Sequence, residues 1–372
     1  MITVQQVVTK KQQKQFVEFP LALYKNNPYF VPPLYGDEMA IFKKDYAYNE
    51  QADHVYYLAY RDGKVVGRIS GIIQKAANKK WKQKRVRFTR FDAIDDQEVA
   101  NALFATVEDW AKQQGMEEAV GPLGFSDLER EGLLIEGFDY LSTFEEQYNY
   151  PYYQKLIENC GYQKEVDWVE SRLKIPQGGL DPRIKTISQR MLEKYNLRFA
   201  EEKNMSVFLK KYADKIFAIW DDTYEKIYGT VPFTEKLKKQ MLDQFKLLID
   251  KRFVPLIVDK DDNVVAFGIA FPGIGKALQK SGGRLTLPCL LRLLPEIKNP
   301  KTLDLGLIGV VDEYKNKGVS SAMLVLMEKM MDYGIEYMET NLNLENNHAI
   351  RNMWKYFDAI QHKRRRCFVK AL

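Results

Sequence analysis

The sequence predicts an α/β fold built on sheets of mixed strand direction and repeated in two tandem domains. One β-hairpin lies in each half of the chain, and each hairpin is followed by alternating strands and amphipathic helices. Hairpins join antiparallel neighbours, whereas strands separated by helices form parallel pairs, so we expect both directions in one sheet. A length of 372 residues exceeds that of one typical core and favours two domains.

The first half shows the order strand, helix, hairpin, strand, helix, strand, helix, strand. Its clearest hairpin surrounds residues 61–64, where Asp62-Gly63 supplies the positive φ angles of a tight turn. Apolar residues at helical spacing mark the helices, and short β-branched or aromatic runs mark the strands. We expect strands at 2–8, 86–91, 118–120 and 167–175, the hairpin at 54–73, and helices at 10–24, 96–114 and 151–159.

The second half repeats this order after a linker at residues 176–179. A helix (183–195) and a strand (197–200) lead to a second hairpin at 254–271, whose turn resembles the first in its residues. The shared order and turn chemistry indicate an internal duplication, so we expect domains at 1–176 and 177–372. An insertion near 276–300 carries an apolar run and predicts either a short helix over a cleft or an additional core helix.

Composition narrows the class of protein. With 45% hydrophobic and 28% charged residues the chain resembles a globular protein that dissolves in water. The net charge is +6, but no nucleic-acid-binding module accompanies it, so we expect no nucleic-acid partner. Three scattered cysteines and three histidines predict neither a disulfide framework nor a metal site. We find no signal peptide and no apolar run of the roughly 18 residues that a membrane span needs, which favours a cytoplasmic location.

One stretch, Leu305–Leu326, carries the strongest functional signal. It begins as an apolar strand, turns at the basic, glycine-containing segment 312–318, and resumes as a helix. Such a turn presents backbone N–H groups at the positive end of a helix dipole, which suits a phosphate or pyrophosphate. The chain contains neither the dinucleotide-binding nor the P-loop glycine pattern.

Residues 311–324 resemble the acyl-coenzyme A binding motif of the GCN5-related N-acetyltransferases (GNATs), which is Gln/Arg-x-x-Gly-x-Gly/Ala between a strand and a helix. Residues 344–350 resemble the second motif of that family, an Asn at the start of a helix. Residues 152–162 of the first half are similar to its closing helix. The resemblance covers nearly the whole chain as two tandem GNAT-like domains. It implies transfer of an acetyl or other acyl group from acyl-coenzyme A to an amine.

The resemblance assigns cofactor-binding residues to the second domain only. In the first domain the matching turn, residues 93–98, has no glycine and several carboxylates, which would repel a pyrophosphate. In the second domain Lys315 replaces the usual Gln or Arg, and Ser320 replaces the usual Gly or Ala. A backbone N–H near Val310 or Val311 is expected to hold the thioester oxygen. The expected cofactor-binding residues are Val310, Val311, Lys315, Asn316, Lys317, Gly318, Val319, Ser320, Ser321, Asn346 and Asn347.

Catalysis requires a base, because an amine with a pKa near 10 must lose a proton before it attacks. Glu339 on a predicted strand is the first candidate, and Glu345 is the second. Many relatives place a Tyr acid on the closing helix. That position is Met353 or Trp354 here, and Tyr356 lies on the same helix facing another way.

The acceptor is expected to be a small-molecule or peptide amine. Two alternatives stay open at the level of the sequence. One is a GNAT-fold binding or regulatory protein without turnover. The other is a transferase that uses aminoacyl-tRNA as donor, which the positive net charge permits.

Overall fold

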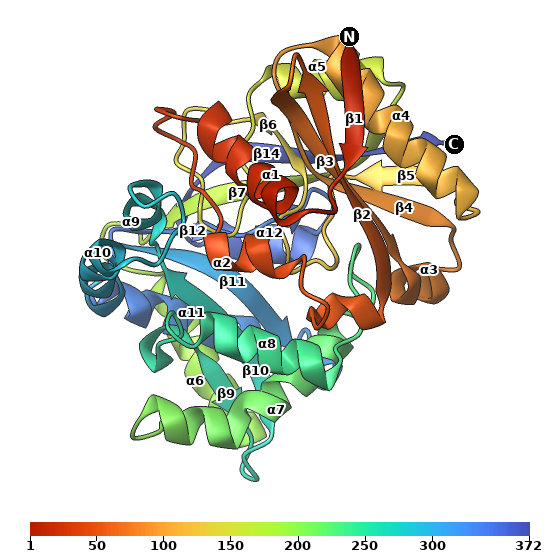
Figure 1. Ribbon diagram of the computed structural model, residues 1–372. Coiled ribbons are helices and arrows are strands. Elements are labelled where there is room, and N and C mark those ends of the chain that lie inside the picture. The colour runs from red at the N-terminus through yellow and green to blue at the C-terminus, as the bar shows by residue number, and fades with distance from the viewer.

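The computed structural model describes all 372 residues, and its strands join into one continuous sheet with helices on both sides (Figure 1). The strands are β1 (Ile2–Gln6), β2 (Ala52–Arg61), β3 (Lys64–Gln74), β4 (Arg85–Ala93), β5 (Glu118–Gly121), β6 (Leu133–Glu136), β7 (Gln163–Lys174), β8 (Arg198–Phe199), β9 (Leu256–Val258), β10 (Val264–Pro272), β11 (Thr302–Val310), β12 (Tyr337–Thr340), β13 (Asn343–Leu344) and β14 (Asp358–Ala371).

The helices occupy most of the segments in which the sequence predicts them. They are α1 (Lys10–Leu23), α2 (Tyr35–Ala40), α3 (Lys75–Trp81), α4 (Gln97–Gln113), α5 (Tyr152–Asn159), α6 (Pro182–Tyr195), α7 (Met205–Tyr224), α8 (Glu235–Phe245), α9 (Gly275–Gln279), α10 (Leu287–Lys298), α11 (Val319–Met331) and α12 (His348–Trp354), with 3₁₀ turns η1 (Ala47–Glu50), η2 (Lys251–Phe253) and η3 (Asp312–Tyr314). No helix combines the length and the apolar character that a membrane crossing requires.

The sheet has the mixed direction that the sequence predicts. Its order is β1-β2-β3-β4-β5-β14-β7-β12-β11-β10-β9-β8, with β6 beside β14 and β13 beside β7. Only β4 with β5 and β11 with β12 are parallel pairs. Each half therefore has an antiparallel hairpin region followed by one parallel pair, as expected for a duplicated unit.

The two halves exchange their last strands. Strand β14 from the end of the chain pairs with β5 of the first half, and β7 of the first half pairs with β12 of the second. The two exchanged strands also pair with each other along most of their length. Figure 1 shows β14, the dark-blue strand, reaching among the elements of the first half, with the C-terminus close to β5. The strand predicted at 167–175 does form, but it does not close its own half, because β14 takes the place beside β5.

Hydrophobic packing also crosses between the halves. One apolar cluster joins Phe16, Tyr56 and Phe125 of the first half to Tyr212 and Trp220 on α7. The insertion forms α9 and α10, which pack in a separate cluster through buried residues such as Cys289 and Leu293. Helix α10 packs into this cluster through Cys289 and Leu293, whereas its residues Leu287, Leu291 and Leu294 are exposed, so it is not a fully buried core helix.

Candidate functional site

The parallel strands β11 and β12 separate after four residue pairs. Thr302–Leu305 of β11 pairs with Tyr337–Thr340, and beyond Leu305 strand β11 keeps a partner only in β10. The hydroxyl of Tyr224 on α7 occupies the opened side, where it donates to the Ile308 carbonyl (3.1 Å) and accepts from the Ile308 N–H (3.2 Å). The separation leaves backbone groups of β11 facing a space between the strands.

Strand alternation decides which amides face this space. The N–H of Val311 donates to the Val265 carbonyl of the neighbouring hairpin, 3.0 Å away. Successive N–H groups of an antiparallel strand point to opposite edges, so the Val310 N–H points to the opened side. Of the two amides expected to hold a thioester oxygen, Val310 is free to do so and Val311 is engaged in the sheet.

The turn before α11 contains backbone N–H groups that donate to no acceptor in the protein. Gly318 precedes the helix with φ 86°, and no side chain caps the helix there. Asn316 also has a positive φ, 62°. The N–H groups of Asn316, Gly318, Val319 and Ser320 have no acceptor within the protein. Four free donors at the positive end of a helix dipole form a site for an anion such as a pyrophosphate.

The two lysines of this turn are held close to it. Lys315 pairs with Asp312 three residues earlier, and Lys317 lies 3.9 Å from Glu313. The Lys317 ammonium also lies over the rings of Tyr195 and Tyr314, at 5.3 and 5.1 Å from their centroids. Both lysines are partly exposed, so their positive charges remain available to an anion in the turn.

The matching turn of the first half is closed to an anion. There Asp96 caps α4, accepting hydrogen bonds from the N–H groups of Glu98 (2.9 Å) and Val99 (3.4 Å). Arg61 pairs with this carboxylate at 2.7 Å. Because the helix start already holds its own negative charge, it would repel a phosphate. That this half lacks a pyrophosphate loop stays a prediction.

A large cavity begins at the open turn of α11. Its volume is about 740 Å³, and 34 of its 51 lining residues are hydrophobic. Lys315, Asn316 and Ser320 line the end near the turn, and the free stretch of β11 lines the middle. Helices α7 and α8 form an apolar wall that includes Trp220 and Phe245. The volume falls in the upper part of the range of roughly 300–1,000 Å³ typical of ligand pockets.

The first half contributes the carboxylates of this cavity, here called its acidic end: Asp127, Glu129, Glu131, Glu145 and Glu146 all line it. Burial raises the pKa of Asp127 to about 6 and that of Glu145 to about 8. Burial, together with nearby Asp127 and Glu146, also raises the pKa of Glu131 well above its ordinary value. A hydrophobic cavity with an acidic end suits a ligand that has an apolar body and a positive group.

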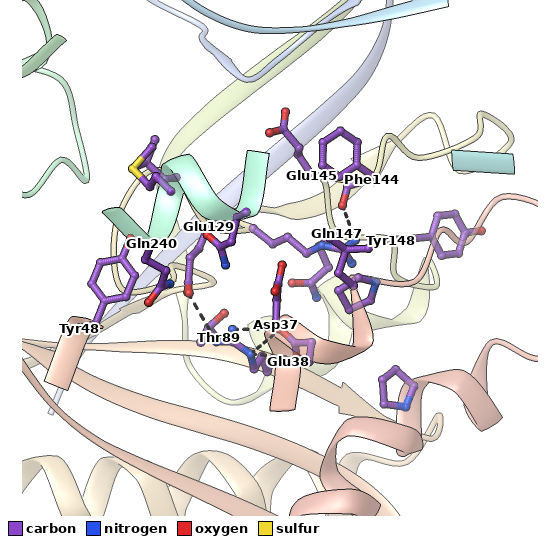
Figure 2. Close-up of a pocket in the computed structure, with 18 of the residues that line it drawn as sticks. Asp37, Glu38, Tyr48, Thr89, Glu129, Phe144, Glu145, Gln147, Tyr148 and Gln240 are labelled. Carbon is purple, nitrogen blue, oxygen red and sulfur yellow. Dashed lines mark hydrogen bonds and ion pairs between the residues drawn. The ribbon is translucent and has the colours of Figure 1, made fainter. Parts of the chain in front are cut away.

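A smaller, polar pocket of about 170 Å³ adjoins this acidic end. Figure 2 shows Asp37 and Glu38 near its centre, whereas the carboxylate of Glu145 points away from them. Its charges are largely paired; Arg90 contacts Glu38 at 3.1 Å, for example. Glu129 and Glu145 line both spaces, so the two pockets are neighbours.

The structure does not bring the expected catalytic residues to the large cavity. Glu339 is bound by Arg172 (2.6 Å) and lies 2.8 Å from His362 Nε2, and its pKa is lowered because these partners and Lys363 outweigh the effect of burial. Glu345 pairs with Lys164 at 2.6 Å, and Tyr356 is 49% exposed. None of the three lines the cavity, so we assign Glu339 and Glu345 structural ion pairs.

The expected cofactor residues divide into two groups. Val310, Lys315, Asn316, Ser320 and Asn347 line the cavity. The remaining ones lie on the turn, in the sheet or beside Asn347 without lining it, namely Val311, Lys317, Gly318, Val319, Ser321 and Asn346.

Asn347 caps α12 by accepting from the Ile350 N–H, 3.3 Å away. Met353 and Trp354, at the other end of the same helix, line the cavity and stand where many members of the family have a tyrosine.

Comparisons with known proteins show which sequences and folds this chain is similar to. No protein-family model matches the chain. Protein YghO of Escherichia coli (strain K12) is 29% identical over 98% of this chain and 94% of its own length. A protein named bacterial ceramide synthase from Caulobacter vibrioides (strain NA1000 / CB15N) is 26% identical over 98% of this chain and 96% of its own. Among solved structures, a tandem GNAT protein from the clavulanic acid biosynthesis pathway is 10% identical, with a TM-score of 0.57, and covers 100% of this chain and 98% of that one.

The chain is a tandem GNAT-fold protein. The resemblance in its sequence, the parallel pair that opens in the second half and the similarity over the full length of a tandem GNAT structure all lead to this fold.

Proposed function

We propose that this protein is an acyl-coenzyme A dependent N-acyltransferase whose substrates carry long hydrocarbon chains. The observation that carries the proposal is one continuous cavity of about 740 Å³ that joins the free amides before α11 to an apolar wall and an acidic end. A short acetyl group and a small polar amine would leave most of that apolar wall in contact with water. A long chain would cover it, at a gain of roughly 25 cal/mol per Å² of apolar surface.

The residues of the second half fit the coenzyme. The free N–H groups of Asn316, Gly318, Val319 and Ser320 would bind its pyrophosphate, with Lys315 adding positive charge. When bound, acyl-coenzyme A supplies a thioester whose carbonyl carbon accepts the attacking amine. The Val310 N–H, facing the opened side of β11, would donate to the oxygen of that carbonyl as negative charge develops on it.

The name of one relative supports the nature of the substrates. A ceramide is the amide of a fatty acid with a long-chain amino alcohol, and the Caulobacter relative is named for its synthesis. The apolar cavity of this chain has the chemistry to accommodate such chains. We therefore propose a fatty acyl donor and an acceptor with a primary amine on a long chain.

A panel assay tests this function. The purified protein is incubated with acetyl-, octanoyl- or palmitoyl-coenzyme A and with glycine, ethanolamine or sphinganine, and both free thiol and amide are measured. We expect amide and thiol in equal amounts, with the fastest turnover for a long-chain donor with sphinganine. Equal or faster turnover with acetyl-coenzyme A and the small amines would contradict the long-chain assignment. Failure of the folded protein to form any amide would contradict acyl transfer itself.

A further inference from the structure

The acidic end of the large cavity contains a carboxylate that no structural role accounts for. Glu131 is 5% exposed, and its Oε2 atom is buried without any hydrogen-bond partner. The side chain nevertheless lines the cavity. A buried carboxylate without a partner is costly, so it is expected where a ligand completes it.

Two of the neighbouring carboxylates, Glu129 and Glu146, have contacts within the protein. Glu129 accepts from the Tyr46 hydroxyl (2.9 Å) and from the Phe125 N–H (3.1 Å). Glu146 lies 3.4 Å from the guanidinium of Arg365. Glu146 Oε2 also lacks a hydrogen bond, but it has the charge of Arg365 beside it, whereas Glu131 has neither a hydrogen bond nor an ion pair.

The backbone around Glu131 is fixed. Gly132 follows it with φ 73°, and a Cβ there would lie 2.8 Å from the side chain of Arg365, so only glycine fits. The Gly132 N–H donates to the Pro122 carbonyl at 2.8 Å. The Glu131 side chain is thus presented from a rigid turn, which is what a binding group needs.

The buried side chain of Arg87 lies near Glu131 but makes no hydrogen bond to its carboxylate. Arg87 donates to the carbonyls of Gly124 (3.1 Å) and Gly229 (3.0 Å). Glu131 Oε2 lies beside Gly229, 3.5 Å from where a Cβ would be. Asp127 lies against the same glycine.

The same segment reaches the opened strand. Tyr224, five residues before Gly229, contacts the Ile308 backbone on β11. The segment from Tyr224 to Gly229 therefore connects Glu131 with the strand that would hold the thioester. The carboxylate and the proposed Val310 donor face one cavity from opposite domains.

We propose that Glu131, assisted by Asp127, binds the ammonium group of the acceptor and removes its proton. This inference rests on the proposed function and adds to it a base supplied by the domain that has no cofactor loop. It assigns to the acceptor a primary amine that is positively charged when it binds.

The step balances in atoms and charge. Glu131 takes one proton from the ammonium, and the freed lone pair forms the C–N bond with the thioester carbon. The C–S bond breaks, and the remaining excess proton on nitrogen moves to the departing sulfur. The products are an amide, a free thiol and a proton that Glu131 later releases to solvent.

Kinetics of Glu131→Gln test the catalytic part. We expect kcat to fall by about 100-fold or more, the usual contribution of a general base, while acyl-coenzyme A binding stays unchanged. We expect kcat of the wild type to rise with pH, this rise to disappear in Glu131→Gln, and Glu131→Asp to restore part of it. The control is Glu136→Gln, at an exposed carboxylate on the adjoining strand β6, which should behave as wild type.

Two outcomes of these kinetics would overturn the assignment. One is a Glu131→Gln enzyme with wild-type turnover and pH profile. The other is a parallel loss of acyl-coenzyme A binding, which would show that Glu131 only maintains the structure.

A binding experiment separates this inference from the proposed function. Trp168 and Trp220 line the cavity, so their fluorescence reports on ligands that enter it. We expect dodecylamine to bind the wild type at least about 10-fold more tightly than dodecanol, a difference close to that of one charged hydrogen bond. Glu131→Gln should abolish that difference. Equal affinity of the wild type for the two ligands would overturn the ammonium site even if amide formation is observed. If no amide forms but the wild type still prefers dodecylamine, the proposed acyl transfer is contradicted and the ammonium site is not.

Discussion

Gly318 and Gly334 are glycines with left-handed backbone at the two ends of helix α11, and their surroundings differ. Gly318 has φ 86° and precedes the helix, where the free amides lie. Gly334 has φ 82° and follows the helix, with nothing within 4 Å of the position of a Cβ. The pair therefore allows backbone strain to be separated from anion binding.

Replacing Gly318 with Glu should abolish acyl-coenzyme A binding, measured by calorimetry. The new carboxylate would bring a negative charge to the residue that carries one of the free amides, which should repel the pyrophosphate, while left-handed backbone costs about 1 kcal/mol or more for a residue with a Cβ. Gly334→Glu imposes the same strain far from the turn and should bind acyl-coenzyme A as the wild type does. Equal loss of binding in both variants would show that the turn is not the site.

Glu131 should make stability depend on pH in a defined direction. Burial beside Asp127 and Glu146 raises its folded pKa well above the unfolded value near 4.3, despite the opposing charge of Arg87. The unfolded chain therefore releases this proton first as pH rises, and the free energy of unfolding falls above about pH 4.3. We expect Glu131→Gln to melt at a higher temperature than the wild type, by a margin that is larger at pH 8 than at pH 5. A margin independent of pH would contradict the raised pKa.

At the level of elements, helix α7 decides the shape of the cavity. One of its faces lines the cavity, including Ala213, Ile216 and Trp220, whereas Ala218 lies on an exposed part of the same helix. The sequence of α7 contains several aromatic residues, but composition alone does not say which of them line a cavity. Which residues face the cavity followed from tertiary packing against α8 and β11, which no local pattern specifies.

Replacing Ala213 with Trp should shorten the chains that the enzyme accepts. The indole would fill part of the apolar cavity, so turnover with palmitoyl-coenzyme A or sphinganine should fall about 10-fold or more while shorter substrates keep their rate. Ala218→Trp adds the same side chain outside the cavity and should leave chain-length preference unchanged. An identical chain-length profile for Ala213→Trp and the wild type would place the hydrocarbon chain elsewhere.

At the scale of the whole molecule, the exchange of β7 and β14 binds the halves together. On these strands Glu170 contacts Arg365 Nε at 2.5 Å and Lys363 Nζ at 3.2 Å, and all three side chains are almost completely buried. Burial opposes ionisation of Glu170, but the two cations outweigh it and lower its pKa. A continuous sheet with a buried ionic network at its centre predicts one cooperative unfolding transition.

Replacing Glu170 with Gln should therefore destabilise both halves together. It leaves two buried cations without their partner, and the expected loss is about 3–5 kcal/mol in the free energy of unfolding, measured by urea denaturation. Glu136→Gln removes an exposed ion pair between β6 and Arg364 of β14, the strand that also carries Arg365, and should cost about 1 kcal/mol or less. Two separate transitions in the wild type would show that the halves fold independently.

The sequence predicted the element order, the duplication and the open turn because these rest on local signals. Asp62-Gly63 fixes a hairpin, and Gly318 before an apolar helix marks the turn at which α11 begins. Strand exchange rests on pairing between residues nearly 200 positions apart, such as Glu170 and Arg365, and no local signal reports it. The carboxylates of the cavity escaped prediction for the same reason. Glu131 lies in no recognised motif, and only the fold shows that it lines the same cavity as the turn of the other domain.

The most direct measurement is a product analysis of palmitoyl-coenzyme A and sphinganine incubated with the wild type and with Gly318→Glu. For the wild type, we expect mass spectrometry to detect the N-palmitoyl amide and free coenzyme A in a one-to-one ratio, and for the variant neither above the uncatalysed background. The result that would contradict acyl transfer on long chains is the absence of amide with a folded wild-type protein, or its formation at the same rate by both proteins.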